Sequence, residues 1–151
     1  MISKITMEQL KLDNQICFPF YAVSRLITRE YQPHLDRLGI TYPQYLVMLV
    51  LWENDGISVN EITQRLILNT NTMTPLLKRM EGLGLISRMR SEDDERKIIV
   101  SLTEKGSAMK AEAGLIPESL MSNISPEAVN VEELLAMKDK LQDWIEYLKK
   151  K

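Results

Sequence analysis

The stretch from residue 58 to residue 102 most constrains the fold, because four local structure signals follow one another there in a fixed order. Ser58-Val59-Asn60-Glu61 fits a capping box, in which a hydroxyl and a carboxylate satisfy unpaired backbone amides at a helix start. We therefore expect a short helix over Val59 to Leu66. The polar run Asn69-Thr70-Asn71-Thr72 then indicates a turn and the start of a second, amphipathic helix, which Gly84 ends.

A charged hairpin is predicted after this pair of helices. Two β-prone runs, Leu85 to Arg90 and Lys97 to Leu102, flank the charged hexapeptide of residues 91–96. Two short helices joined by a polar turn match the helix-turn-helix plan, and the hairpin adds a wing to it. Each signal alone is also typical of ordinary caps, turns and solvated charges, so only their joint order favours this plan. The predicted fold class is mainly α with a small β-hairpin wing.

Helical segments are also predicted near the start of the chain. Apolar residues recur at helical spacing from Asp13 to Tyr31, with Asp13 as the expected N-cap. Pro19 should kink this helix or fray its first turn, because proline lacks a backbone amide hydrogen. A separate short turn of helix is expected after Pro33, ending at Gly39.

Further helices are predicted on either side of the hairpin. Thr41 should cap a helix over Tyr45 to Trp52, which is hydrophobic nearly all round and therefore expected to be buried. Thr103-Glu104-Lys105-Gly106 should open the next helix, and Ser125-Pro126-Glu127 indicates the cap of a final helix running toward Lys149. The apolar stripe of this last helix is wider than one small winged domain should cover, so we expect a partner subunit to cover it.

Length, composition and charge narrow the class of protein. With 151 residues and 44% hydrophobic residues, the chain is expected to form one globular domain. The sequence shows neither a signal-peptide pattern nor an apolar run of about 20 residues, so we expect a cytoplasmic protein without a membrane anchor. The net charge of -2 argues against a wholly basic nucleic-acid binder, although cations gathered on one face can still meet phosphates.

Polar and cationic side chains gather where a helix-turn-helix protein would meet DNA. In such proteins the start of the second helix enters the major groove, and short polar side chains there reach base edges and phosphates. We expect this role for Thr70, Asn71, Thr72 and Thr74, with phosphate contacts from Lys78 and Arg79. Cations on the hairpin lie at Arg88, Arg90, Arg96 and Lys97. Asp94 could hold the Arg96 guanidinium through a charge-assisted pair, and Arg96 could enter the minor groove.

Four stretches resemble the MarR family of winged-helix repressors, and within it the OhrR-type organic-hydroperoxide sensors of the one-cysteine type. These stretches are residues 12–18 (LDNQICF), 40–52 (ITYPQYLVMLVLW), 72–84 (TMTPLLKRMEGLG) and 90–103 (RSEDDERKIIVSLT). The resemblance implies a repressor, not an enzyme, that binds an inverted repeat in double-stranded promoter DNA as a homodimer. It also maps the family's wing arginine onto Arg96.

The resemblance further implies a domain layout. Residues 1–151 would form a single MarR-type domain, with dimerisation helices at about 10–36 and 104–150 and the winged helix-turn-helix at about 41–103. The chain departs from the subgroup at Asn69-Thr70-Asn71, where its members usually carry an acidic residue, serine and glycine. This departure leaves the preferred operator sequence open.

Cys17 is the only cysteine, so it cannot form a disulfide within the chain. A lone cysteine in an apolar helix is more often a small buried hydrophobe than a reactive group, although a place near a helix start favours the thiolate. By resemblance, Cys17 occupies the peroxide-sensing position. Tyr31 and Tyr42 occupy positions of tyrosines that reach the thiol from the partner subunit, where a donating phenol would stabilise a thiolate.

The resemblance then implies a mechanism for control. An organic hydroperoxide would oxidise Cys17 to a sulfenic acid, and a small cellular thiol would condense with it. The added bulk would not fit a packed helix interface, so the two winged domains would move apart and release DNA.

Other functions stay open at this point. A MarR-type repressor could instead be released by a small aromatic ligand in the dimer crevice, with Cys17 structural. A thiol peroxidase would need a base beside Cys17, and the only histidine, His34, shows no link to it in the sequence. A winged-helix scaffold that binds proteins and no DNA is the third alternative. We predict no cofactor and no metal site, since one cysteine and one histidine cannot close a zinc shell.

Overall fold

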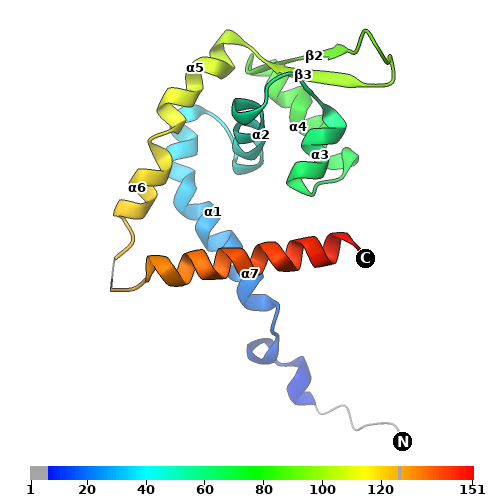
Figure 1. Ribbon diagram of the computed structural model, residues 1–151. Helices are drawn as coiled ribbons and strands as arrows, with labels where there is room; N and C mark the ends of the chain where they lie inside the picture. Colours follow the sequence, from blue (N-terminus) through cyan, green and yellow to red (C-terminus); the bar gives the residue numbers. More distant parts are fainter. Residues whose placement is uncertain (1–6, 126) are drawn as a thin grey trace, which may run out of the picture. The chain divides into compact units, whose positions relative to one another are not determined.

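The computed structural model describes residues 7–125 and 127–151, and it consists mostly of helices with one small antiparallel sheet (Figure 1). Two compact units are formed, one by the residues up to Ile116 and one by Pro117 to Lys151. The first unit contains every buried hydrophobic residue of the described chain. This architecture confirms the predicted class of a mainly α fold with a β-hairpin wing.

The N-terminal region differs from its prediction. Two short 3-10 helices, η1 (Met7–Leu10) and η2 (Leu12–Asn14), precede the long helix α1 (Phe18–Leu38). Asp13 lies in η2 and does not cap α1, so the expected start at Asp13 was wrong. Cys17 takes the N-cap position instead. The helix starts later because residues 12–14 close a tighter turn of their own.

The two prolines of α1 have different effects from those expected. Pro19 lies in the first two positions of the helix, where an amide hydrogen has no intrahelical partner, so it lies at the helix start and not within the helix as expected. Pro33 lies inside α1 and does not separate a second helical turn, which corrects that prediction. Gly39 ends the helix with a φ of 69°, a left-handed conformation that glycine adopts without a steric cost.

Helix α2 (Tyr42–Glu53) is the centre of the first unit. It begins three residues earlier than the sequence predicted, and the Thr41 amide donates to Gln44 Oε1 at 2.9 Å. The helix packs against α1 and against four later elements of the first unit: three helices and a strand. Its buried side chains are Gln44, Tyr45, Val47, Met48, Val50 and Leu51. The prediction that this helix is buried is therefore confirmed.

The predicted pair of short helices is present. Strand β1 (Ile57–Ser58) leads directly into α3 (Val59–Leu66), whose bounds match the prediction, and α4 (Thr70–Gly82) follows. Helix α4 buries its apolar face in the core and exposes its polar face. The capping box is formed, because the Ser58 amide and hydroxyl donate to Glu61 Oε2 at 2.9 and 2.7 Å and the Glu61 amide donates back to Ser58 Oγ.

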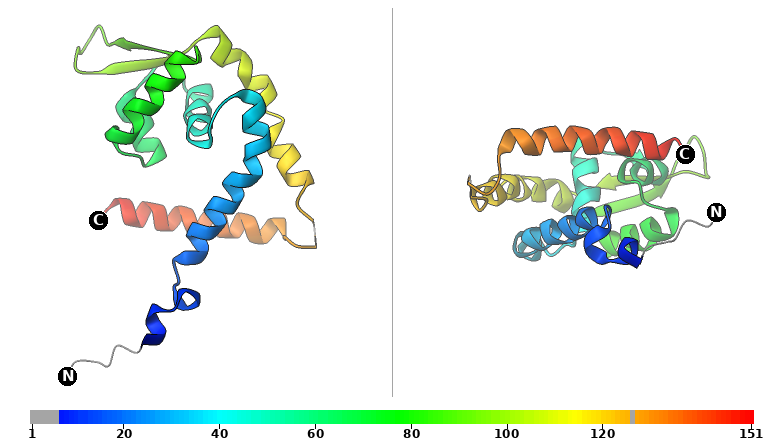
Figure 2. Two further views of the ribbon diagram at one scale, coloured as in Figure 1. Left: turned by 180° about the vertical axis from the view of Figure 1, so that it is seen from behind. Right: turned by 90° about the horizontal axis from the view of Figure 1, so that it is seen from below.

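The hairpin consists of β2 (Ile86–Arg90) and β3 (Ile98–Leu102), and β1 pairs with the other side of β3. All pairs are antiparallel, with Val100 opposite both Ile57 and Arg88. The sequence did not predict β1, since a strand of two residues carries no alternation of its own. The hairpin reaches past α3 and α4, as two opposite views show (Figure 2).

Three helices follow the sheet: α5 (Glu104–Ala113), α6 (Ile116–Ser122) and α7 (Val131–Lys149). Asn130 Oδ1 caps α7 by accepting the Glu132 amide at 2.9 Å, so the predicted cap at Ser125-Pro126-Glu127 was wrong. Ser125 instead closes a turn, in which its carbonyl accepts the Ala128 amide at 2.9 Å, and Pro126 lies outside the described residues. Within the described residues, no helix combines the length and the apolar character that crossing a membrane requires.

Candidate nucleic-acid interface and thiol site

The first turn of α4 presents the polar side chains that the sequence analysis selected. Asn69 caps the helix, and its Oδ1 accepts the Thr72 amide at 2.8 Å. The side chains exposed on this helix include Thr70, Asn71, Thr72, Thr74, Lys78 and Arg79. The opposite face holds Met73, Leu76, Leu77 and Met80 in the core. Because the apolar face of α4 is held in the core, the polar face is turned to solvent.

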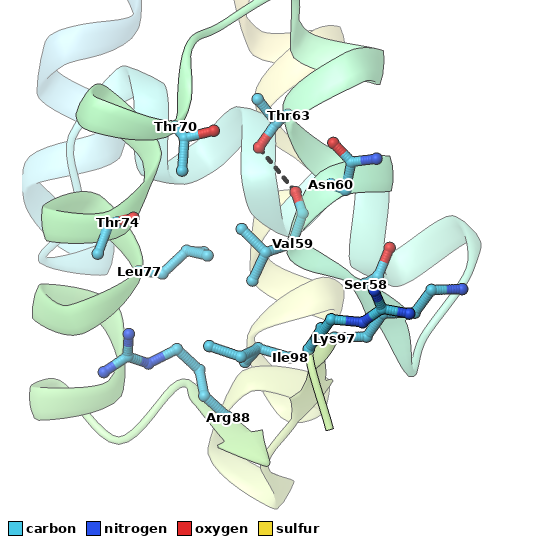
Figure 3. A pocket seen from close by; sticks show the side chains of 11 residues that line it. Ser58, Val59, Asn60, Thr63, Thr70, Thr74, Leu77, Arg88, Lys97 and Ile98 are labelled. Atoms are coloured by element: carbon cyan, nitrogen blue, oxygen red, sulfur yellow. Dashed lines mark hydrogen bonds between the residues drawn. The ribbon is translucent and has the colours of Figure 1, made fainter. Parts of the chain in front are cut away.

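A hollow of about 260 Å³ lies between α3, α4 and the hairpin. Thr70 and Thr74 face it from α4, and Asn60 lines it from α3, while Arg88 of β2 and Lys97, just before β3, border it near the hairpin (Figure 3). The sequence analysis selected the two threonines and Arg88 as DNA contacts but missed Asn60. Asn60 is the third residue of the capping box and is exposed, but the sequence did not show that α3 and α4 bring it to the same hollow as the threonines.

The arginines of the hairpin differ in how they pair with carboxylates of the same chain. The Arg96 side chain is 93% exposed, and its Nε lies 3.2 Å from Asp94 Oδ1, which also accepts the Arg96 amide at 3.1 Å. The expected pair of Asp94 and Arg96 is therefore present. Arg88 donates through Nη2 and Nε to Glu81 Oε2 at 2.8 and 3.2 Å. This pairing holds the pKa of Glu81 below its ordinary value.

A carboxylate also lies close to the hollow. The hydrogen bonds from the Ser58 amide and hydroxyl lower the pKa of Glu61, and the positive charge of Lys97 contributes a smaller effect in the same direction. Lys97 therefore borders the hollow within the electrostatic range of Glu61. A DNA phosphate at this place would meet both signs of charge, because the hairpin carries four carboxylates at residues 92–95 beside its four cations.

The thiol of Cys17 is exposed at the start of α1. Tyr31 lies fourteen residues further along the same helix, which corresponds to about 21 Å at the usual rise of an α-helix. A tyrosine side chain is too short to cross that distance. One chain therefore does not bring Cys17 together with Tyr31, and such a contact requires a second copy of the chain.

The two predicted tyrosines do meet each other. The ring centroids of Tyr31 and Tyr42 are 5.1 Å apart in an edge-to-face arrangement, and Tyr45 lies 5.7 Å from Tyr31 and 6.2 Å from Tyr42. Burial raises the pKa of Tyr42, and the neighbouring Tyr31 adds to this effect. Burial likewise raises the pKa of Tyr45. The phenols of Tyr42 and Tyr45 therefore stay protonated at neutral pH and can act as donors.

The helix-turn-helix, the exposed polar start of its second helix and the charged hairpin together define a winged helix-turn-helix protein. Comparison with known proteins then gives its family. The family model for the transcriptional regulator SarA/Rot matches residues 29–113. The chain is 45% identical to the organic hydroperoxide resistance transcriptional regulator of Bacillus subtilis (strain 168), over 95% of this chain and 96% of the relative.

Solved structures agree with this family. Reduced AbfR bound to DNA superposes with a TM-score of 0.76 and 38% identity, over 93% of this chain and 96% of that one. Disulfide-formed AbfR gives a TM-score of 0.62 and 37% identity, over 96% and 97% of the two chains. The chain belongs to the MarR family of winged-helix transcriptional regulators, and within it resembles the organic-hydroperoxide group.

Proposed function

We propose that this protein is a homodimeric repressor that binds promoter DNA and leaves it when an organic hydroperoxide oxidises Cys17. One observation carries the proposal: an exposed lone thiol at the start of α1, in a chain that is 45% identical over 95% of its length to an organic hydroperoxide resistance regulator. AbfR, solved both reduced on DNA and with a disulfide, supports the redox part. A regulator of promoters would act in the cytoplasm.

The DNA-binding part rests on α4 and the hairpin. The exposed first turn of α4, with Thr70, Asn71, Thr72 and Thr74, would enter the major groove, while Lys78 and Arg79 would meet phosphates. Arg90 and the exposed Arg96, held by Asp94, would lie along the adjacent minor groove. Arg88 would act mainly by fixing β2 to α4, because Glu81 already pairs with its guanidinium.

The dimer would be formed by the terminal helices, at about residues 10–36 and 104–150, around winged helix-turn-helix regions at about 41–103. Exposed apolar side chains along α1 and α7 support this layout, among them Val23, Ile27, Leu135, Trp144 and Leu148. The same dimer would bring Tyr31 and Tyr42 of one protomer to Cys17 of the other. A phenol hydrogen would then be donated to the sulfur across the interface.

The chemical steps balance with two reactants from outside the protein. The Cys17 thiolate attacks the terminal oxygen of the hydroperoxide, which leaves Cys17 as a sulfenic acid and releases an alcohol. A small thiol then attacks the sulfenic sulfur, forming a mixed disulfide and water. The protein ends with a group on Cys17 that the reduced interface has no room for.

Release requires that this group change the geometry of the dimer. Two major-groove helices must sit about 34 Å apart, one turn of DNA, to bind both half-sites. A nearly complete shift between bound and released forms needs about 5.5 kcal/mol of differential affinity. Overpacking of a close interface costs about 1–3 kcal/mol at each site, so two modified protomers could supply most of it.

Fluorescence anisotropy tests the proposal with a duplex that the reduced protein selects from a random-sequence pool. The wild type should release this duplex after cumene hydroperoxide and free cysteine are added at fixed salt. Cys17→Ser should bind with similar affinity and stay bound after the same treatment. Equal release by both proteins would contradict the proposal, and release by a phenolic ligand alone would then favour a ligand-gated repressor.

A further inference from the structure

The aromatic cluster of Tyr31, Tyr42 and Tyr45 extends to the far end of α2. The Tyr45 and Trp52 ring centroids are 6.4 Å apart in an edge-to-face arrangement. Tyr42 is the first residue of α2, and Trp52 lies next to its last residue. The rings therefore form a continuous packed row along this helix, from the proposed partners of the thiol to the helix end.

Trp52 joins the end of α2 to the start of α5. Its indole Nε1 donates to the carbonyl oxygen of Gly106 at 2.9 Å, and this contact is partly buried. The Lys110 ammonium group donates to the carbonyl oxygen of Trp52 at 3.0 Å. Two hydrogen bonds of opposite direction therefore fix the position of Trp52 against the first turns of α5.

The same turn of α5 rests on the backbone just before the wing. A side chain at Gly106 would overlap the carbonyl oxygen of Leu85, so glycine permits this close approach. That carbonyl also accepts the Thr103 amide at 3.0 Å, and the Thr103 hydroxyl donates to the Gly84 carbonyl at 2.6 Å. Leu85 immediately precedes β2, so α5 holds the root of the hairpin at its junction with α4.

We propose that Trp52 is a positioning residue that couples the state of Tyr31 and Tyr42 to the placement of the wing. The coupling would run through Tyr45 and the indole to Gly106, and from there to Leu85. Packed elements of this kind shift between discrete arrangements, so displacement of the tyrosines would move the indole or break its hydrogen bond. The inference rests on the proposed function, because it needs an event at Cys17 that disturbs the tyrosines.

Trp52→Phe tests this role, since it keeps an aromatic ring and removes only the indole donor to Gly106. Arg65→Gln serves as the matched control, because it removes another donor at the same end of α2, where the Arg65 guanidinium donates to Glu53 Oε2 at 2.7 Å. For each variant and the wild type, anisotropy gives the ratio of the oxidised to the reduced dissociation constant on the selected duplex. Intact mass of the same samples gives the fraction of Cys17 that carries the added thiol.

We expect this ratio to fall by about five- to tenfold in Trp52→Phe, with Cys17 fully modified, and to stay near the wild-type value in Arg65→Gln. A full modification of Cys17 with an unchanged ratio in Trp52→Phe would overturn the inference and leave the proposed function standing. A wild type that keeps its DNA after full modification would refute the proposed function, and the inference with it.

A second measurement does not depend on how well Trp52→Phe folds. The chain has two tryptophans, so Trp144→Phe leaves Trp52 as the only one. Its emission should shift when the thiol is added to Cys17 in the absence of DNA, because the surroundings of the indole change. An emission spectrum that stays the same through complete modification would show that Trp52 does not sense the thiol.

Discussion

Among the described residues other than glycine, only Ile67 has a positive φ, at 54°. It is the C-cap of α3 within the helix-turn-helix. A β-branched residue in this left-handed region costs roughly 1–2 kcal/mol, and the exposed side chain gains little burial in return. Ile67→Gly should therefore raise the free energy of unfolding by about 1 kcal/mol, as measured by urea denaturation. Gln64→Gly, in the interior of the same helix, should lower it by about 1 kcal/mol. A lower free energy of unfolding in Ile67→Gly would contradict the claim that the backbone of Ile67 is strained.

Glu61 gives the stability a defined dependence on pH. The Ser58 hydrogen bonds lower the pKa of Glu61 in the folded state. This carboxylate therefore stabilises the fold above its unfolded pKa of about 4.3, and the contribution is lost as pH falls through the lower, folded value. Glu81, whose pKa is lowered by Arg88, acts in the same direction. The urea midpoint should decline as pH falls below about 4.5.

Glu61→Gln isolates this contribution, because glutamine can keep the capping box without titrating. Its urea midpoint should vary less with pH than that of the wild type over the same acidic range. Identical slopes for Glu61→Gln and the wild type would show that the cap does not govern the acid response.

Among the contacts of single residues, those between close neighbours in the chain could be predicted from the sequence. Asp94 and Arg96 are two residues apart on a turn, so their pairing follows from local geometry. The pair of Glu81 and Arg88 could not be predicted, because it forms only once β2 folds back along α4. For the same reason, the sequence could not show that Asn60 shares a hollow with Thr70 and Thr74.

At the scale of elements, the contact between α5 and the root of the hairpin is the tightest glycine-dependent packing. A methyl group at Gly106 would overlap the backbone of Leu85, which cannot turn aside as a side chain can. Gly106→Ala should therefore lower the free energy of unfolding by about 1–3 kcal/mol. Gly82→Ala, where a side chain meets open space within α4, should raise it by up to about 1 kcal/mol. Thermal unfolding of both variants checks the contrast, and equal shifts would contradict it.

The elements with complete local signals were predicted well. The capping box and the flanking polar turn fixed the bounds of α3, and the charged tip between two β-prone runs gave the hairpin. The two prolines of α1 were interpreted wrongly, because Pro19 lies at the start of α1 and Pro33 is accommodated within it. The start of α7 was placed too early, since Ser125 makes a local turn and Asn130 provides the cap. A serine followed by proline suits either arrangement, and only the folded chain selects one.

For the whole molecule, the salt dependence of DNA binding reports which cations meet the duplex. Each lost contact with a phosphate reduces the slope of log affinity against log salt by about 1, so Arg96→Ala in a dimer should reduce it by about 2. The exposed wing position of Arg96 is the reason for this expectation. Arg37→Ala, on α1, should keep the wild-type slope. An unchanged slope in Arg96→Ala would place the wing away from DNA.

The distance between Cys17 and Tyr31 along α1 makes the proposed switch a property of the dimer and not of one chain. The sequence could suggest both positions by resemblance, whereas their separation follows only from the unbroken helix between them. Control by a single thiol then requires that modification at one interface reach both DNA-binding surfaces.

Parallel time courses of DNA release and Cys17 modification test this account most directly. Anisotropy follows the labelled duplex after cumene hydroperoxide and free cysteine are added, and intact mass of quenched samples follows the mixed disulfide on Cys17. We predict that release follows modification with the same time course, and that Cys17→Ser shows neither. Release that precedes modification, or complete modification of a dimer that stays on its DNA, would contradict the claim that Cys17 controls binding.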